Sequence, residues 1–269
     1  MTTLVEPSAW SAPDVPEQPS SGSGVVVTGA ARGLGRGIAR VLASRGWNVV
    51  GVDLSASVDE LQVELGEGHG SVVGDVCEAD VLDRACRLAA DLGGGLGAAV
   101  FNAGVTAPGD TLGYDLADWD RVLGVNLRGV FVGAQAARPH LVAGGSMVML
   151  SSICASQGFA ARASYCASKA GVDGLVRSLA QEWGADGVRV NAVAPGTIET
   201  EMQQAMLASG RASTAGYLER VPLARVGQPS EIGEAVAFLV SARASYISGV
   251  VLPVDGGWAG GGLPATAPS

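Results

Sequence analysis

The stretch Gly24–Gly35, which reads GVVVTGAARGLG, decides the fold of this chain. Its start, Gly24–Thr28, is dominated by valine, which is typical of a strand buried on both faces. The glycine-rich remainder leads into a helical pattern over residues 34–46. Glycines in such a loop let the backbone approach a pyrophosphate, which accepts hydrogen bonds from free N–H groups at the helix N-terminus. The stretch therefore predicts a strand, a phosphate-binding loop and a helix, although a tight turn explains the glycines equally well.

The rest of the chain repeats this alternation of apolar runs and helical patterns. Six more runs predict strands, at residues 48–52, 71–74, 98–101, 146–150, 188–193 and 250–254. Helices are expected near residues 34–46, 56–66, 79–92, 115–138, 163–185 and 229–242. This order predicts one Rossmann-type α/β domain over residues 24–258, with a doubly wound, seven-stranded, mostly parallel sheet and helices on both faces. Ligands of such sheets bind beyond the carboxyl ends of the strands, so the residues that follow each strand are the candidate site residues.

The charge balance narrows the classes of partner. The 269 residues include 17 basic and 26 acidic side chains, for a net charge of −9. Nucleic acid is disfavoured, because phosphate neutralisation requires clustered lysine and arginine. The four cysteines form no Cys-x-x-Cys pair, and the two histidines, His69 and His140, lie far apart, so no zinc site is expected. Reduced thiols and a cytoplasmic location are the simplest interpretation.

Both ends of the chain differ in composition from the domain between them. Residues 1–23 hold four prolines and no apolar run, so a flexible arm is expected there, not a signal peptide or a membrane span. Residues 259–269 are rich in glycine, alanine and proline, and a loose tail is expected. No segment predicts contact with a membrane.

Asp53 ends the second predicted strand, about twenty residues after the glycine loop. A carboxylate at this point can accept hydrogen bonds from both hydroxyls of an adenosine ribose, and it repels a 2′-phosphate. Arg32, in the loop, acts in the opposite sense because a guanidinium can pair with that phosphate. Asp53 outweighs Arg32 in this comparison, so NAD is expected as cofactor, not NADP. A helix N-cap is the other role open to Asp53.

Polar and small residues also follow the third and fourth predicted strands. Asp75 and Val76 follow the third, where a carboxylate can accept a hydrogen bond from an adenine amino group. Asn102, Ala103 and Gly104 follow the fourth, where small residues leave room for a cofactor and the asparagine can tie neighbouring strands together. Taken singly, each of these is more often a loop residue than a ligand.

Tyr165 and Lys169 lie four residues apart on one helical pattern and therefore share a face of that helix. Hydride transfer to or from carbon requires a proton to move to or from oxygen. A tyrosine hydroxyl can do this once its ordinary pKa of about 10 is lowered by a nearby ammonium and a positive nicotinamide ring. A serine hydroxyl, from Ser151 or Ser152 after the fifth predicted strand, can polarise the substrate oxygen, and an asparagine such as Asn126 can order a water that carries the proton away. A solvated helix face is the other interpretation of the Tyr/Lys pair taken alone.

Lys169 is the single lysine of the chain, since the other 16 of its 17 Lys and Arg residues are arginine. A compact ammonium can contact ribose hydroxyls and a phenol together, where a broad guanidinium does not fit. The count therefore favours a catalytic role for this residue, although a single lysine can also fall at this position by chance.

Together these motifs resemble the classical short-chain dehydrogenase/reductase family over about residues 24–258. The resemblance rests on Thr28-Gly29, Gly33-Leu34-Gly35, Asp75, Asn102-Ala103-Gly104, Asn126, Ser152, Tyr165-Cys166-Ala167-Ser168-Lys169 and Pro195-Gly196-Thr197-Ile198-Glu199-Thr200. Ser152 lies 13 residues before Tyr165, as the family's catalytic serine does, and Ser151 is the less favoured candidate. Arg32 stands where extended members of the family need a glycine, which argues against an epimerase.

The resemblance implies a role for each catalytic residue. Tyr165 is expected to be the general acid/base, and Lys169 to bind the nicotinamide ribose and lower the tyrosine pKa. Ser152 is expected to orient the substrate oxygen, and Asn126 to anchor the proton-relay water. The expected cofactor-binding residues are Gly29, Arg32, Gly33, Leu34, Gly35, Asp53, Leu54, Asp75, Val76, Asn102, Ala103, Gly104, Tyr165, Lys169, Pro195, Gly196, Ile198 and Thr200.

The substrate side is less distinct. Residues 197–225 resemble the family's substrate lid, and Ile153 is expected to add to a mostly apolar pocket beside it. The expected substrate-binding residues, for most of which core packing is the other interpretation, are Ser152, Cys154, Phe159, Tyr165, Met202 and Met206. The segment from Ala244 to Gly257 resembles the family's tetramer interface, so a homotetramer is expected.

The expected activity is the NAD(H)-dependent interconversion of a secondary alcohol and a ketone. The expected partner is a small-molecule substrate, with neither nucleic acid nor a membrane. An alternative within the enzymes is an NADPH-dependent 3-oxoacyl-carrier-protein reductase, against which Asp53 and the acidic charge count. An alternative from another class is a non-catalytic dinucleotide-sensing regulator, which typically lacks the tyrosine or the lysine.

Overall fold

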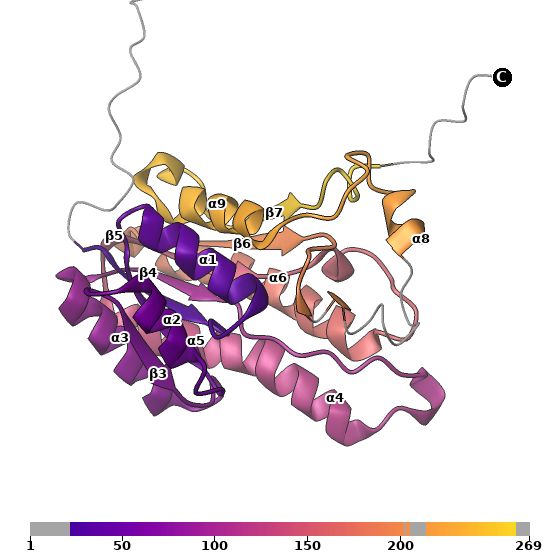
Figure 1. The fold of residues 1–269 in the computed structure, drawn as a ribbon, viewed down its shortest axis with the longest axis horizontal. Helices are drawn as coiled ribbons and strands as arrows, with labels where there is room; N and C mark the ends of the chain where they lie inside the picture. The colour runs from indigo at the N-terminus through magenta and orange to yellow at the C-terminus, as the bar shows by residue number, and fades with distance from the viewer. Residues whose placement is uncertain (1–21, 202, 205–213, 262–269) are drawn as a thin grey trace, which may run out of the picture.

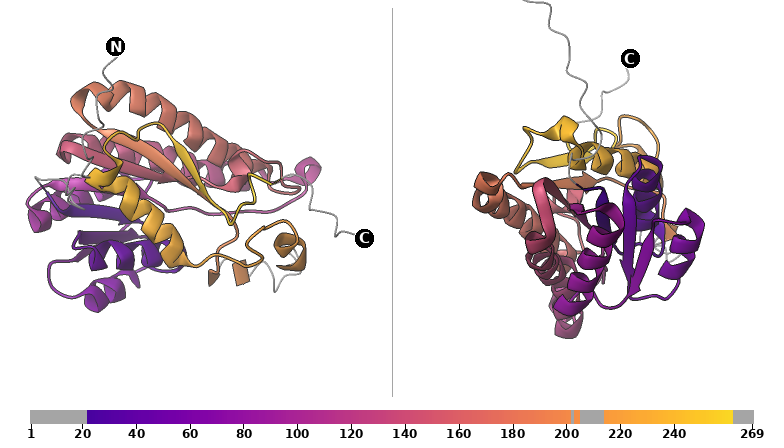
Figure 2. Two further views of the ribbon diagram at one scale, coloured as in Figure 1. Left: turned by 90° about the horizontal axis from the view of Figure 1, so that it is seen from above. Right: turned by 90° about the vertical axis from the view of Figure 1, so that its left-hand side faces the viewer.

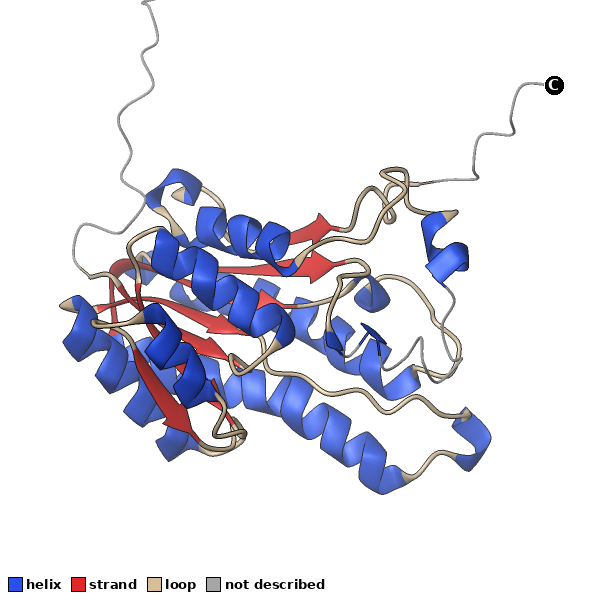
Figure 3. Ribbon diagram, viewed as in Figure 1, coloured by secondary structure: helices blue, strands red, loops and turns tan. Residues whose placement is uncertain are grey.

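Seven parallel strands form the centre of the computed structural model, which describes residues 22–201, 203–204 and 214–261. The strands are β1 (Gly24–Thr28), β2 (Asn48–Asp53), β3 (Gly70–Val73), β4 (Leu96–Phe101), β5 (Leu141–Leu150), β6 (Arg189–Pro195) and β7 (Val251–Val254). Their order across the sheet is β3-β2-β1-β4-β5-β6-β7 (Figure 1). Every neighbouring pair is parallel, so the arrows in Figure 3 share one direction.

Helices cover both faces of this sheet, as Figure 2 shows from two sides. One face is covered by α1 (Gly33–Ser44), α2 (Val58–Leu65) and α9 (Pro229–Val240). The other is covered by α3 (Ala79–Gly93), α5 (Gly129–Ala137) and α6 (Ala163–Trp183). Strand β1 serves both cores, because Val25 and Val27 point to the first and Val26 to the second. The doubly wound Rossmann-type fold expected from the sequence is confirmed.

The helix expected over residues 115–138 is present from Leu116 to Ala137, but it contains a π-helical turn that was not predicted. The segment folds as α4 (Leu116–Leu123), a π-helical turn (Gly124–Arg128) and then α5. Asn126 lies in the π-helical turn, fully buried, and its side chain bonds both backbone groups of Val105. A π-helical turn inserts one extra residue and re-aims the side chains around it. Hydrophobic periodicity along the chain does not reveal such an insertion.

Most other expected elements agree with the observed ones to within a few residues. Strand β5 differs most, because it begins at Leu141 instead of residue 146. Its pairing with β4 shifts register between Leu96 and Ala98. The first residues of the strand therefore pair irregularly, and they lie outside the apolar run, residues 146–150, that predicted it. The short helix α8 (Thr214–Leu218) lies within the expected lid and was not predicted.

Arg189, at the start of β6, closes the end of α9. Its buried guanidinium donates to the carbonyls of Leu239 at 2.7 Å, Val240 at 3.3 Å and Ser241 at 3.1 Å. Burial lowers the pKa of this group to about 10, so it stays charged at neutral pH and complements the negative end of the helix. Because α9 packs alongside α1, this contact also supports the helix that follows the glycine loop (Figure 1).

Within the described residues, no helix is long and apolar enough to cross a membrane. The same part of the chain contains no group of three or more His, Cys, Asp or Glu side chains that could hold a metal ion. All four cysteines are free thiols. Most of the expected N-terminal arm and C-terminal tail, residues 1–21 and 262–269, lies outside the described residues.

Candidate active site

A cleft of about 580 Å³ opens at the carboxyl ends of the central strands. It lies where the chain leaves the β1-β2-β3 side of the sheet and continues on the β4 side, which is where doubly wound sheets bind ligands. Predicted cofactor residues that line it are Gly29, Arg32, Gly33, Leu34, Gly35, Asn102, Ala103, Gly104, Tyr165, Lys169, Pro195, Gly196, Ile198 and Thr200. Predicted substrate residues that line it are Ser152, Cys154, Phe159 and Tyr165.

The glycine loop is packed so closely that side chains are excluded from it. Gly29 has φ +68°, and a Cβ on it would lie 2.8 Å from the Cα of Ala103. A Cβ on Gly35 would collide with the carbonyl oxygen of Gly29 and with the side-chain amide of Asn102. These glycines are therefore required by close approach of the backbone on both sides of the loop.

Thr28 and Asn102 lock the loop to the neighbouring strand. The Asn102 side-chain amide donates to the carbonyls of Thr28 at 2.9 Å and Gly29 at 3.2 Å. In return, the Thr28 hydroxyl accepts from the backbone N–H groups of Asn102 at 2.9 Å and Ala103 at 3.1 Å. Asn102 thus ties β1 to β4 at the floor of the cleft.

The N-terminus of α1 fits an anionic ligand. Arg32 is its N-cap residue and makes no side-chain cap, and the first turn contains no acidic residue. No side chain of this first turn caps its N–H groups, the helix dipole favours negative charge there, and the Glu201 carboxylate lies beside Gly33. Arg32 is exposed and lines the cleft.

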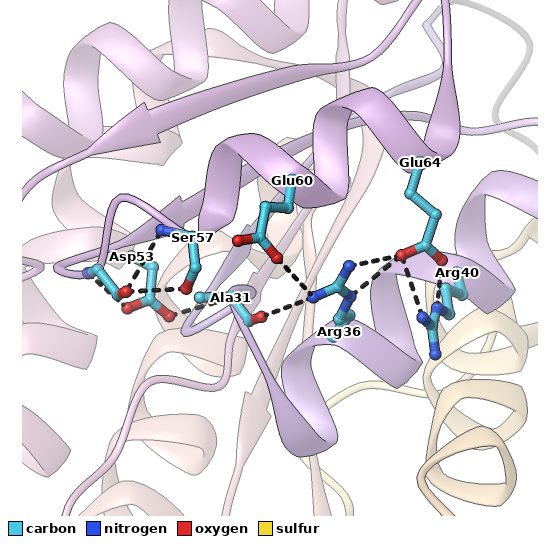
Figure 4. A network of polar contacts seen from close by, with 8 residues as sticks. Ala31, Arg36, Arg40, Asp53, Ser57, Glu60 and Glu64 are labelled. Carbon is cyan, nitrogen blue, oxygen red and sulfur yellow. Dashed lines mark hydrogen bonds and ion pairs between the residues drawn. The ribbon is translucent and has the colours of Figure 1, made fainter.

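Asp53 holds the outer side of the same loop (Figure 4). Its carboxylate accepts from the backbone N–H of Ala31 at 3.0 Å and of Ser55 at 2.9 Å. Arg36 donates to the carbonyl of Ala31 at 3.3 Å and is itself held by Glu64 at 2.7 Å. Asp53 is not the N-cap of α2, because Ser57 occupies that position.

Four predicted cofactor residues do not line the cleft: Asp53, Leu54, Asp75 and Val76. Leu54 is 73% exposed, and Asp75 accepts from the backbone N–H of Cys77 at 2.8 Å. They lie at the ends of β2 and β3, beyond the side of the cleft that the glycine loop forms.

The two serines after β5 face different partners. Ser151 donates to the Asp173 carboxylate at 2.5 Å, which occupies its hydroxyl proton. The Ser152 hydroxyl accepts from the backbone N–H of Cys154 at 3.2 Å, and its interaction with the Tyr165 phenol opposes the rise that burial causes in the pKa of that phenol. Ser152 is thus the serine that the structure places against Tyr165.

Lys169 lies buried one helical turn after Tyr165. Its Nζ donates to the carbonyl of Leu150 at 2.6 Å and lies 5.7 Å from the centre of the Tyr165 ring. Burial lowers the pKa of this ammonium to about 8, while the negative charge of Asp173 opposes that shift. At neutral pH the lysine is still mostly protonated.

The Tyr165 phenol is a weak acid in this cleft. Burial raises its pKa to about 12, whereas the Ser152 hydrogen bond and the positive charge of Arg162 lower it. Additional positive charge beside the ring is therefore needed before the phenolate can form near neutral pH.

The side chain of Asn126 bonds to the backbone of Val105 and to the Ser168 hydroxyl. Its Oδ1 accepts from the backbone N–H of Val105 at 2.8 Å, and its Nδ2 donates to the Val105 carbonyl at 2.9 Å and to Ser168 at 3.1 Å. Both amide hydrogens and one oxygen lone pair are thereby used. Asn126 joins the loop after β4 to helix α6.

Aromatic side chains from distant segments meet where substrate residues were expected, and two of them, Phe159 and Tyr217, line the cleft. Phe159 stacks on Trp258 with ring centres 6.1 Å apart, and Tyr217 approaches Trp258 at 5.6 Å. Cys154 is buried beside them. The predicted substrate residues Met202 and Met206 lie outside the described residues.

Several cleft residues escaped prediction from sequence. They are Val105, Thr106, Arg121, Leu150 and Arg162, whereas the cleft residues Thr197, Glu201, Gln203 and Tyr217 lie in the segment expected as the substrate lid. A signal existed for Arg162, which precedes Tyr165 by three residues at the entry to the predicted helix. The others belong to segments without a motif.

Comparisons with known proteins agree with this architecture. Residues 29–259 match a family profile described as enoyl-(acyl carrier protein) reductase. The cis-4-hydroxycyclohexanecarboxylate dehydrogenase of Sinomonas cyclohexanicum is 41% identical over 87% of this chain and 95% of its own. A 3-oxoacyl-[acyl-carrier-protein] reductase of Vibrio cholerae is 36% identical over 88% of this chain and 97% of its own.

A longer relative and a solved structure extend the comparison. An uncharacterized short-chain type dehydrogenase/reductase of Sinorhizobium fredii is 39% identical over 90% of this chain, which spans 44% of that protein. A structure from Beutenbergia cavernae, described as a candidate NAD(P) dependent gluconate 5-dehydrogenase with bound NADP, is 34% identical with a TM-score of 0.84. The match covers 91% of this chain and 100% of that one. With a matching profile over most of its length and relatives above 30% identity, this chain belongs to the classical short-chain dehydrogenase/reductase family.

Proposed function

We propose that this oxidoreductase interconverts a secondary alcohol and a ketone with NAD(H), using Tyr165 as the general acid/base. The observation that carries the proposal is the position of the phenol. Tyr165 meets the Ser152 hydroxyl and the Lys169 ammonium in one cleft, whose opposite side is the glycine loop. An alcohol oxygen placed there would contact a proton acceptor, a hydroxyl and a positive charge together.

The residues present fit a nicotinamide dinucleotide. The glycine loop and the start of α1 would hold the pyrophosphate, since the backbone approaches closely there and the helix end has no side-chain cap. Pro195–Thr200 would lie against the nicotinamide end, with Gly196 packed directly on Asp255. When bound, the cofactor supplies the hydride acceptor and, in its oxidised form, a positive charge.

Each catalytic side chain then has a distinct task. Lowering the phenol pKa from about 12 to the neutral range requires roughly 6 kcal/mol of stabilisation of the phenolate. The Lys169 ammonium, 5.7 Å from the centre of the Tyr165 ring, is already in place at that value, so the remaining stabilisation would come from positive charge that a bound cofactor brings. Ser152 would orient the substrate oxygen towards Tyr165, and Asn126 would hold the loop that carries Val105 in place.

NAD is the proposed cofactor because of Asp53. Its carboxylate stands at the end of β2, beside the loop that would hold the adenosine side of the cofactor. A 2′-phosphate at that point would be repelled. Arg32 lines the cleft and favours NADP, as does the NADP bound to the similar structure, so NADPH-dependent 3-oxoacyl-carrier-protein reduction is the second candidate. The net charge of −9 disfavours an acidic carrier protein.

Two similar proteins are named for hydroxy acids, one a cyclohexanecarboxylate and the other gluconate. We therefore propose that the substrate is a small hydroxylated molecule that binds beside the aromatic side of the cleft. The enzyme is further proposed to work as a cytoplasmic homotetramer, which sedimentation at micromolar concentration would test.

The decisive test is a panel of cyclic, aliphatic and polyol alcohols with NAD⁺ and NADP⁺, followed by absorbance of the reduced cofactor. Wild type should oxidise at least one secondary alcohol, with NAD⁺ preferred. Tyr165→Phe should lower kcat about 10²–10⁴-fold, because the proton acceptor is removed. The variant should still bind NADH in a fluorescence titration, since the ring volume is kept. Unchanged turnover in Tyr165→Phe, or cofactor binding without any turnover in wild type, would contradict the proposal.

A further inference from the structure

The charge of the cleft is opposite to that of the chain. The chain has 26 acidic and 17 basic Lys and Arg side chains. Among the described residues that line the cleft, four are basic and one, Glu201, is acidic. The basic residues are Arg32, Arg121, Lys169 and Arg162. A local excess of positive charge in an acidic protein indicates a negatively charged ligand.

Three of these four cations have an assignment already. Arg32 begins α1 beside the glycine loop, and Lys169 lies under the phenol. Arg121 pairs with Asp118 on its own helix at 2.6 Å. Arg162 is the cation whose place in the cleft neither the cofactor nor the proton transfer explains.

The backbone positions Arg162 with some strain. Ala161, directly before it, has φ +59°, a left-handed conformation that alanine rarely adopts. The carbonyl of Ala161 accepts from the backbone N–H of Gly109 at 3.0 Å, which holds the loop in this shape. Strained backbone of this kind persists where the surrounding structure requires it, and it is frequent at ligand sites.

The side chain of Arg162 is half-buried on the substrate side of the cleft. Its Nη2 donates to the Tyr217 hydroxyl at 3.3 Å, and its Cζ lies 5.9 Å from the centre of the Phe159 ring. Burial raises the pKa of the Cys154 thiol, and the Arg162 charge opposes that rise, as it does for the Tyr165 phenol. The positive potential of Arg162 thus reaches the point where the alcohol oxygen would react.

We propose that Arg162 binds a carboxylate of the substrate, so that the substrates are hydroxy acids and the matching oxo acids. This inference rests on the proposed alcohol dehydrogenase activity. A guanidinium matches a carboxylate with two parallel hydrogen bonds, and it keeps its charge at every working pH. The rings of Phe159 and Tyr217, which pack on the buried Trp258, would contact the carbon skeleton between the carboxylate and the reacting alcohol.

The test compares hydroxy acids with their neutral amides, which have nearly the same shape. Suitable pairs are 4-hydroxycyclohexanecarboxylate, 3-hydroxybutyrate and gluconate, each with its amide. For at least one pair, wild type should show kcat/KM about 10²-fold higher for the acid. Arg162→Met should reduce that ratio to within about threefold, and Arg162→Lys should retain part of it. Arg220→Met is the matched control, since Arg220 lies 4.5 Å from the Trp258 ring but is exposed and does not line the cleft.

A binding measurement separates this inference from the proposed activity. Cyclohexanecarboxylate, which cannot be oxidised at an alcohol, should bind wild type and Arg220→Met in calorimetry, and should bind Arg162→Met at least tenfold more weakly. If alcohols are oxidised but acids and amides react equally, or if Arg162→Met keeps the preference, carboxylate recognition is wrong and the activity stands. If no alcohol is oxidised, the proposed activity fails, and the calorimetry alone decides whether Arg162 binds carboxylates.

Discussion

The two sides of the cleft are built in different ways. The cofactor side is mostly backbone: Gly29 and Gly35 leave no room for a Cβ, and Asn102 donates to the carbonyls of Thr28 at 2.9 Å and Gly29 at 3.2 Å. The substrate side is made of side chains, with Phe159 and Trp258 ring centres 6.1 Å apart although the residues lie 99 positions apart in the sequence.

This difference predicts which residues of the cleft can be substituted and which cannot. Close backbone packing tolerates no substitution, whereas aromatic side chains can be exchanged for others of similar volume at a modest cost. We therefore expect the cofactor side to fail completely when altered, and the substrate side to change its selectivity while the fold remains.

The largest effect is expected at the boundary between the two sides, where two neighbouring serines act differently. Ser152→Ala should lower kcat about 10²–10³-fold, because the hydroxyl that meets the Tyr165 oxygen is lost. Ser151→Ala removes only the bond to Asp173 and should change kcat less than about fivefold. Steady-state kinetics with one alcohol measures both. Equal losses in the two variants would mean that the substrate side depends on the whole turn and not on one hydroxyl.

The next effect tests the backbone character of the cofactor side. Gly35→Ala should destabilise the protein by about 2 kcal/mol, because the added Cβ meets the Gly29 carbonyl. It should also abolish the NADH fluorescence titration. Gly174→Ala, in the middle of α6, is the control: a Cβ there meets nothing within 4 Å, so a gain of about 0.5–1 kcal/mol is expected. Urea unfolding measures both. A stable Gly35→Ala variant that binds NADH normally would contradict the claim that the cofactor side depends on close backbone packing.

The smallest effect concerns Asp53, the side chain that is proposed to select NAD on the cofactor side. Asp53→Asn keeps an acceptor for the Ala31 N–H but removes the charge. The ratio of kcat/KM for NAD⁺ over NADP⁺ should fall about tenfold, or 1.4 kcal/mol, since solvent screens a half-exposed carboxylate. Asp59→Asn, the same change on α2, should leave the ratio unchanged. An unchanged ratio in Asp53→Asn would assign cofactor choice to another residue.

Prediction from sequence succeeded where function depends on local geometry. The run Gly24–Thr28 was predicted with its observed bounds, and the glycine loop lines the cleft. Tyr165 and Lys169 meet because four residues make about one helical turn. Periodicity failed at Gly124–Arg128, where the buried Asn126 bonds to Val105, 21 positions away, and the helix accommodates an extra residue.

The sequence by itself determined the alternation of strands and helices, the glycine loop and the spacing of the catalytic pair, because each depends on residues close together in the chain. Only the tertiary structure decided which partners hold Asn126 and which cation lies beside the Phe159 ring. Arg162 acquires its place from a strained turn at Ala161, a loop at Gly109 and an aromatic partner at Tyr217. Those segments come together only when the whole domain packs, and the sequence of one segment does not predict its contacts with the others.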